Sequence, residues 1–155
     1  DYNKKLFPSD LLSLAVCNLG LQWSLDLSYT IKLFHQYLEK NGVLAFSIPL
    51  SGTLCEMKSS YRNYSYKDNE VIRVLQQSQF ELFDFSKTFM IKNFSSAIEA
   101  IKSIKAVGAN CPSSQGRTQL RHALMQKEKI ENVFLNTDNI TLTYNMGIFL
   151  AKKKR

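Results

Sequence analysis

Leu11–Trp23 reads LLSLAVCNLGLQW, an uncharged apolar run followed by a short polar and aromatic segment. The seven residues from Leu11 to Cys17 alternate too little for a half-exposed strand and are too few for a helix. They therefore predict a strand buried on both faces, of the kind found in parallel sheets. Ligands of such sheets bind beyond the carboxyl ends of the strands, so the sequence predicts a site at Asn18–Trp23.

A helix is predicted after this segment, because Asp26 or Ser28 can cap it and apolar residues recur at the helical spacing of three to four. The predicted buried stripe consists of Leu27, Ile31, Phe34 and Leu38. We expect Gly42 to end the helix in the left-handed conformation, although Asn41-Gly42 is also a hairpin-turn sequence.

A second buried strand is predicted over Val43–Ile48, which completes a strand–helix–strand unit with parallel strands. Pro49–Gly52 then breaks the strand, so this loop is predicted at the same edge of the sheet as Asn18–Trp23, as a second wall of the site. Further along the chain the periodicity predicts helices over Leu54–Arg62, Asp68–Gln77, Ser96–Val107 and Arg117–Glu131, and strands over Phe80–Lys92 and Ile140–Ala151.

Length and composition are those of one globular domain, with 155 residues of which 45% are apolar. No apolar run approaches the roughly 20 residues needed to span a bilayer, and the start, DYNKKLFPSD, lacks the order of a signal peptide. The sequence thus predicts a soluble, cytoplasmic protein without a membrane partner. The three cysteines, Cys17, Cys55 and Cys111, form no C-x-x-C pair and are expected to be buried thiols.

The net charge of +7 gives little reason to expect nucleic-acid binding. Four of these charges lie in the terminal run Lys152–Arg155, which leaves three for the rest of the chain. The run is expected to be a solvated end. A modestly basic body remains compatible with an acidic protein partner.

Common catalytic and phosphate-binding motifs are absent from the sequence. None of the six glycines lies in a G-x-G-x-x-G or Walker loop, and no serine lies in G-x-S-x-G. His35 and His122 each stand alone on a predicted helix, without metal-ligand spacing, and are expected to be structural. We therefore predict no catalytic residue and no metal ligand.

Lys105 is the one charged residue that the helical pattern singles out. At 100° per residue it falls within an apolar arc formed by Phe94, Ala97, Ile98, Ile101 and Ile104. Two interpretations stay open. The lysine stem covers apolar surface while the ammonium reaches water, or the ammonium binds an anion.

Three segments together resemble one enzyme family. They are Asn18–Trp23, the strand Gly42–Phe46 with Ser51–Leu54 after it, and Ser103–Ala109 with the sequence SIKAVGA. Gly116–Leu120 and the ending Leu142–Tyr144 add to the match. The chain resembles the malonyl-acyl-carrier-protein O-methyltransferases of biotin synthesis, which are class I S-adenosylmethionine-dependent methyltransferases.

The resemblance implies an α/β fold: the carboxyl-terminal half of a Rossmann-like methyltransferase sheet, with a helical lid inserted before a last, antiparallel strand. It implies a single partial domain over residues 1–155, divided into sheet core and rim (1–92), lid (93–135) and final strand with basic tail (136–155). The family's Gly-rich cofactor loop is not in this sequence. We therefore expect a fragment that is inactive alone and that self-associates or binds a missing amino-terminal half.

The family resemblance also implies roles for single residues. Asn18 and Leu19 would lie beside the methionine moiety of S-adenosylmethionine, while Gln22 and Trp23 would lie where the methyl group is transferred, although Trp23 could equally be a core residue. Lys105 would contact the substrate. The residues expected to meet the acidic carrier protein are Lys102, Arg117 and Arg121.

Methylation of a carboxylate needs no general base, since the attacking oxygen is already anionic. The resemblance makes methylation of the free carboxyl of malonyl-acyl-carrier protein the leading functional hypothesis, and the absence of acid–base residues agrees with it. Two alternatives remain: another class I methyltransferase or a homologue with a different cofactor-dependent step, and a non-catalytic remnant or binding module.

Overall fold

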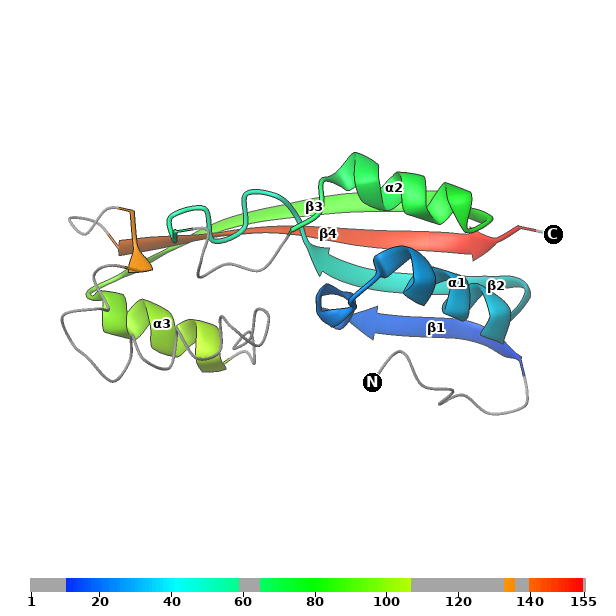
Figure 1. Cartoon of the computed structure of the whole chain (residues 1–155), viewed down its shortest axis with the longest axis horizontal. Helices are drawn as coiled ribbons and strands as arrows, with labels where there is room; N and C mark the ends of the chain where they lie inside the picture. The colour runs from blue at the N-terminus through cyan, green and yellow to red at the C-terminus, as the bar shows by residue number, and fades with distance from the viewer. Residues whose placement is uncertain (1–10, 59–64, 107–132, 136–139, 155) are drawn as a thin grey trace. The chain divides into compact units, whose positions relative to one another are not determined.

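The computed structural model describes residues 11–58, 65–106, 133–135 and 140–154 (Figure 1). The chain divides into two compact units, each built from separate stretches of sequence. The first unit consists of residues 1–51, 65–88 and 145–155, and the second of residues 52–64 and 89–144. The site predicted at Asn18–Trp23 lies in the first unit.

Four strands form one mixed sheet in the order β1-β2-β4-β3 (Figure 1). Their bounds are β1 Leu12–Asn18, β2 Leu38–Pro49, β3 Phe80–Phe94 and β4 Ile140–Lys153. β1 pairs with β2 in parallel, and β2 pairs with β4 in antiparallel orientation. The predicted parallel pair and the predicted antiparallel last strand are thus confirmed.

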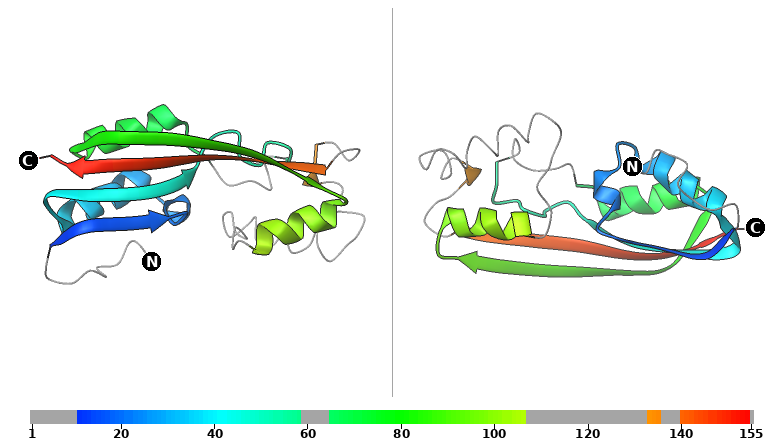
Figure 2. Two further views of the ribbon diagram at one scale, coloured as in Figure 1. Left: turned by 180° about the vertical axis from the view of Figure 1, so that it is seen from behind. Right: turned by 90° about the horizontal axis from the view of Figure 1, so that it is seen from below.

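Helices α1 (Leu27–Tyr37) and α2 (Asp68–Gln77) lie on the same face of the sheet (Figure 2). Asp26 caps α1, because its Oδ1 accepts a hydrogen bond from the Tyr29 backbone N–H at 3.0 Å. The core between helices and sheet includes Ile31, Phe34, Leu44, Phe46, Val71, Leu75 and Phe149. The Phe149 ring stacks on both Phe46 and Phe85, at centroid distances of 5.0 and 4.6 Å.

The prediction that β1 is buried on both faces is wrong. Ala15 and Cys17 are buried against the helices, whereas Leu14 is 53% and Val16 70% exposed. The reason is the placement of α1 and α2, which cover only one face of this part of the sheet. The opposite face of β1 is apolar and exposed to solvent.

The helix expected to continue to Gly42 ends at Tyr37 instead, and β2 begins at Leu38. Leu38 pairs with Leu12 of β1 and therefore belongs to the sheet, although it still fits the helical spacing of the apolar residues. Asn41, with φ of 67°, is the left-handed residue in place of Gly42. Gly42 is needed for another reason: a Cβ there would lie 3.0 Å from the carbonyl oxygens of both Glu39 and Leu12.

In the second unit, α3 (Ala97–Ala106) packs its buried residues with Met57, Val133, Phe134, Ile140 and Leu142. The predicted helix over Leu54–Arg62 is wrong for its described part, where the chain forms turns up to a bridge at Met57. The backbone of this segment bonds to β4 instead: the Leu54 N–H donates to the Thr143 carbonyl at 2.7 Å. The Glu56 carboxylate accepts from the Thr143 backbone N–H at 3.0 Å and also bonds the Thr143 hydroxyl.

Two smaller predictions are corrected. Cys55 is exposed, while Cys17 is buried as expected and Cys111 lies outside the described residues. The basic run is not simply a solvated end, because the Lys153 ammonium donates to the carbonyl oxygens of His35 and Leu38, each at 2.7 Å. Lys153 thereby satisfies carbonyls at the end of α1, where a positive charge is favourable. The predicted helix over Arg117–Glu131 lies outside the described residues.

Candidate functional site at the carboxyl ends of β1 and β2

The turn after β1 departs from ordinary backbone geometry. Leu19 has φ of +52°, the left-handed conformation that a residue with a Cβ seldom adopts. Such a residue persists only where its surroundings hold it, and conformations of this kind cluster at ligand sites. Asn18 and Leu19 are both exposed at this end of the sheet.

Ser47 of β2 holds this turn through three hydrogen bonds. The Leu19 N–H donates to the Ser47 carbonyl at 3.2 Å and to its Oγ at 3.0 Å. The Ser47 hydroxyl in turn donates to Asn18 Oδ1 at 2.5 Å. Ser47 is the register partner of Asn18 in the parallel pair, so the two strands end side by side.

A short 3₁₀ turn, η1 (Leu21–Trp23), follows, and its first residue anchors it in the core. Leu21 is fully buried, and the Trp23 N–H donates to the Gly20 carbonyl at 3.1 Å. Gln22 is half-buried and Trp23 is 37% exposed. Trp23 is therefore not a core residue and presents part of its indole to solvent. The first unit thus contains all four residues predicted around the cofactor: Asn18, Leu19, Gln22 and Trp23.

The second wall also starts where predicted, since β2 ends at Pro49 beside the end of β1. Its backbone is tied down by three bonds: Leu50 N–H to the Asn145 carbonyl at 2.7 Å, Ser51 N–H to the Tyr66 carbonyl at 2.8 Å, and Asn145 Nδ2 to the Ser51 carbonyl at 2.8 Å. The loop is therefore a braced segment of the first unit up to Ser51.

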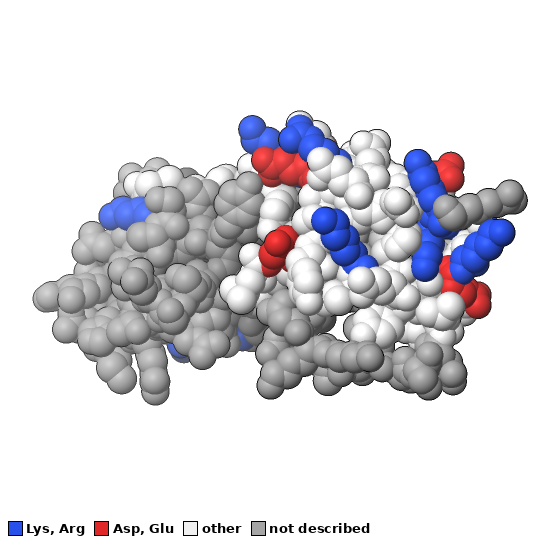
Figure 3. Space-filling view, turned by 45° about the vertical axis from the view of Figure 1, so that its right-hand side comes forward, with Lys and Arg blue, Asp and Glu red and all other residues white. Residues whose placement is uncertain are grey.

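The charged residues predicted to bind substrate or carrier protein belong to the second unit or lie outside the described residues. Lys102 and Lys105 are exposed on α3, so Lys105 does not lie in the buried stripe of that helix. Arg117 and Arg121 lie outside the described residues. Among the described residues on the face drawn in Figure 3, Lys and Arg side chains are mixed with Asp and Glu.

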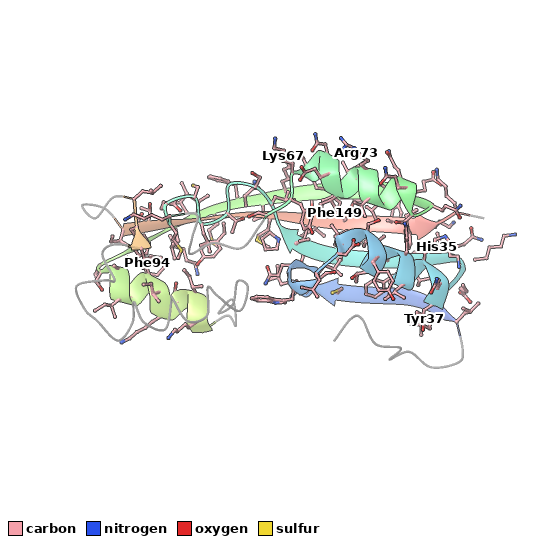
Figure 4. All side chains as sticks on the ribbon, in the orientation of Figure 1. His35, Tyr37, Lys67, Arg73, Phe94 and Phe149 are labelled. Carbon is pink, nitrogen blue, oxygen red and sulfur yellow. The ribbon has the colours of Figure 1, made fainter. Side chains whose placement is uncertain are left out.

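Shifted pKa values occur away from Asn18–Trp23 in the part of the chain that the structure describes. Burial and, secondarily, the Lys153 charge lower the pKa of His35, which lies at the end of α1 (Figure 4). Its Nε2 is buried without a hydrogen-bond partner. The Lys87 ammonium, which forms an ion pair with Asp68, lowers the pKa of that carboxyl.

The site around Asn18 and Ser47 is polar but has no ionisable side chain among Asn18, Leu19, Gln22, Trp23 and Ser47. It is equipped for hydrogen bonding and for aromatic contact rather than for proton transfer. Over residues 11–58, 65–106, 133–135 and 140–154, no group of three or more metal-ligating side chains comes together. None of the helices in these ranges is long and apolar enough to cross a membrane.

Comparison with curated proteins confirms the family resemblance. The chain is 38% identical over 154 residues to malonyl-[acyl-carrier protein] O-methyltransferase 2 of Coxiella burnetii, covering 99% of this chain and 59% of that protein. It is 29% identical over 140 residues to methyltransferase 1 of the same organism, covering 83% of this chain and 50% of that protein. The chain thus spans between half and three fifths of these relatives. No family model matches the sequence.

Comparison with solved structures confirms the fold. BH2331 of Bacillus halodurans, a candidate methyltransferase, superposes with a TM-score of 0.64 at 10% identity, covering 100% of this chain and 70% of that chain. An S-adenosylmethionine-dependent methyltransferase of Mesorhizobium loti gives 0.51 at 14% identity, with 99% and 67% covered. The [4+2]-cyclase SpnF gives 0.57 at 13% identity, with 99% and 55% covered. The chain has the class I methyltransferase fold, which also serves other reactions.

Proposed function

We propose that this chain forms the carboxyl-terminal part of an S-adenosylmethionine-dependent methyltransferase that esterifies the free carboxyl of malonyl-acyl-carrier protein, a step of biotin precursor synthesis. The observation that carries the proposal is the 38% identity to the Coxiella enzyme over 99% of this chain. The fold and the exposed turn after β1 support it. The localisation that goes with this function is cytoplasmic.

The residues after β1 suit part of the cofactor. Exposed Asn18 offers hydrogen bonds, exposed Leu19 offers apolar contact, and Trp23 adds an aromatic surface. We assign Asn18 and Leu19 to the methionine moiety, and Gln22 and Trp23 to the methyl-transfer rim. The bound cofactor supplies an electrophilic methyl group on a sulfonium centre. The remaining contacts to it would come from a Gly-rich loop, which this sequence does not contain.

The chemistry fits a site without acid or base residues. A carboxylate oxygen forms the new bond to the methyl carbon while the bond from that carbon to sulfur breaks, and no proton moves. The protein then contributes alignment, and the braced, uncharged turn at Asn18–Trp23 is suited to holding a ligand in a fixed position. We assign Lys105 to the polar groups of the acceptor, and Lys102, Arg117 and Arg121 to the acidic carrier protein.

A polypeptide that supplies the part of the relatives' length not spanned here, or a second copy of this chain, is the proposed assembly partner. The chain spans only 59% of its Coxiella relative, and β1 exposes Leu14 and Val16 on an edge strand. Unpaired edge amides and exposed apolar side chains favour pairing with another polypeptide.

A hybrid enzyme tests the function. This chain replaces the stretch that it matches in the Coxiella methyltransferase 2, and transfer of labelled methyl from S-adenosylmethionine to malonyl-acyl-carrier protein is measured. We expect activity in the hybrid, and no binding as tight as about micromolar, or −8 kcal/mol, by the 155-residue chain alone.

Lys105→Met in the hybrid keeps the side-chain stem and removes the charge. Loss of one charge-assisted contact, roughly 1.5–3 kcal/mol, should lower kcat/KM about ten- to a hundredfold, with Lys32→Met on α1 as the matched control. Micromolar binding by the isolated chain would contradict the half-site assignment. A folded hybrid without methyl transfer would favour a non-catalytic binding module, and transfer to another acceptor a different methyltransferase.

A further inference from the structure

We propose that Ser47 is a positioning residue, which orients the Asn18 carboxamide so that its N–H₂ group is presented as a hydrogen-bond donor at the carboxyl end of β1. The group that this site receives is then an oxygen acceptor, such as a carboxylate or carbonyl. Only this last identification, of the ligand group, rests on the proposed function. The orientation itself follows from the hydrogen bonds of the described residues.

The direction of the hydrogen bonds is fixed by the backbone. A backbone N–H can only donate, so Ser47 Oγ is the acceptor in its 3.0 Å contact with Leu19 N. The single hydroxyl proton of Ser47 is then available for the 2.5 Å contact to Asn18 Oδ1. An amide nitrogen facing Ser47 would instead bring two donors to Oγ and leave the hydroxyl proton without this acceptor.

The orientation determines what the site can bind. With Oδ1 turned to Ser47, the Nδ2 protons of Asn18 lie on the other branch of the carboxamide, and Asn18 is exposed. The neighbouring Leu19 N–H is already used twice by Ser47. Asn18 Nδ2 is therefore a donor that this turn offers to a ligand, while Asn18 Oδ1 already accepts one hydrogen bond, from Ser47.

Ser47 also keeps the turn in shape. The left-handed Leu19, at φ of +52°, is held by both the carbonyl and the hydroxyl of this one residue. Ser47 lies on β2, which pairs with β1, so the sheet rather than a loop determines the position of the turn. Residues held by a rigid element give the positional accuracy that ligand orientation needs.

NMR on the 155-residue chain tests the orientation. Ser47→Ala should raise amide hydrogen exchange at Leu19 at least tenfold and abolish the nuclear Overhauser contacts that fix the Asn18 side-chain amide. Ser47→Thr keeps the hydroxyl and should restore both. The proposal is overturned if Ser47→Ala leaves these Asn18 contacts unchanged, or if exchange rises equally at all β1 and β2 amides, which is the pattern of a merely structural residue. The matched control is Ser86→Ala on exposed β3.

Asn18→Asp in the hybrid enzyme tests the donor. Aspartate keeps the oxygen that accepts from Ser47 but replaces the donor by an anionic oxygen, so the turn should stay intact while kcat/KM falls about a hundredfold or more. Full activity in Asn18→Asp with a preserved turn overturns the donor role. If the unmodified hybrid transfers no methyl group, the proposed function fails, while the exchange and Overhauser measurements still decide the role of Ser47.

Discussion

The imidazole of His35 gives the fold a sensitivity to acid that can be predicted from one side chain. The imidazole and the Phe80 ring form a T-shaped pair at a centroid distance of 5.3 Å, and Nε2 is buried without a hydrogen-bond partner. Burial lowers the pKa of His35 from the ordinary 6.5. Below about pH 6.5 the unfolded chain takes up a proton that the folded chain resists. The free energy of unfolding should therefore fall as the pH falls below 6.5, and this loss should stop once the pH passes the lowered pKa.

Urea titrations at pH 7.5 and pH 5.5 measure this effect. The carboxylates titrate in every variant, so His35→Leu serves as the reference, and its midpoint should change less between the two pH values. Equal shifts in the native and His35→Leu proteins would show that His35 does not contribute to acid sensitivity.

At this same scale, the sequence predicted Asn18, Leu19, Gln22 and Trp23 but not Ser47. A site at Asn18–Trp23 follows from the apolar strand, because residues after such a strand lie at the ligand-binding edge. The roles of the four residues were implied by the family resemblance. Ser47 lies inside a predicted strand, and its role depends on register: it is placed opposite Asn18 only by the pairing of β1 with β2. Single-sequence periodicity gives no register, although a polar residue near the end of an apolar strand is a usable signal. The Lys153 contacts to α1 were unpredictable for the same reason.

Among the elements, the junction of α1 and β2 depends on Gly42. A Cβ at this position would lie 3.0 Å from two backbone carbonyl oxygens, those of Glu39 and Leu12, which cannot rotate away as a side chain can. Gly42→Ala should therefore destabilise the first unit by roughly 1–3 kcal/mol, the usual cost of overpacking. Chemical denaturation with circular dichroism measures the loss. Asn41→Gly is the matched control, since the left-handed φ of 67° suits glycine and little or no loss is expected. An unchanged midpoint for Gly42→Ala would mean that the strands separate there at no cost.

The predicted helices were correct where no distant strand binds the same backbone, and wrong where one does. α2 was predicted with its observed bounds, because its apolar spacing and its acidic first turn agree. The helix expected from Leu54 failed, because β4 captures its backbone through Thr143. α1 was expected to extend to Asn41-Gly42 but ends at Tyr37, because Leu38 fits the helical stripe and also pairs with Leu12. A short window of sequence shows the local helical spacing but not the pairing with a distant strand.

For the whole molecule, the sheet face opposite α1 and α2 predicts association. Register places Leu14, Val16 and Ile148 on this face, and they are 53%, 70% and 43% exposed. We expect sedimentation to show self-association or a bound polypeptide. Leu14→Lys with Val16→Lys should shift the chain toward monomer, whereas Tyr29→Lys, an exposed position on α1, should not. A monodisperse monomer of the unmodified chain, with nothing bound, would refute this expectation.

The strand order also has a consequence for synthesis on the ribosome. β4 lies between β2 and β3, yet it is made after both of them. From Phe94 at the end of β3 to Lys153 at the end of β4 is 59 residues, which at roughly 5–20 residues per second takes about 3–12 seconds. A β-hairpin forms in microseconds, so the delay is set by translation and not by the chain. During those seconds β2 and β3 have no central strand to join them, and Phe46 and Phe85, which stack on Phe149 of β4 in the folded protein, are accessible to chaperones.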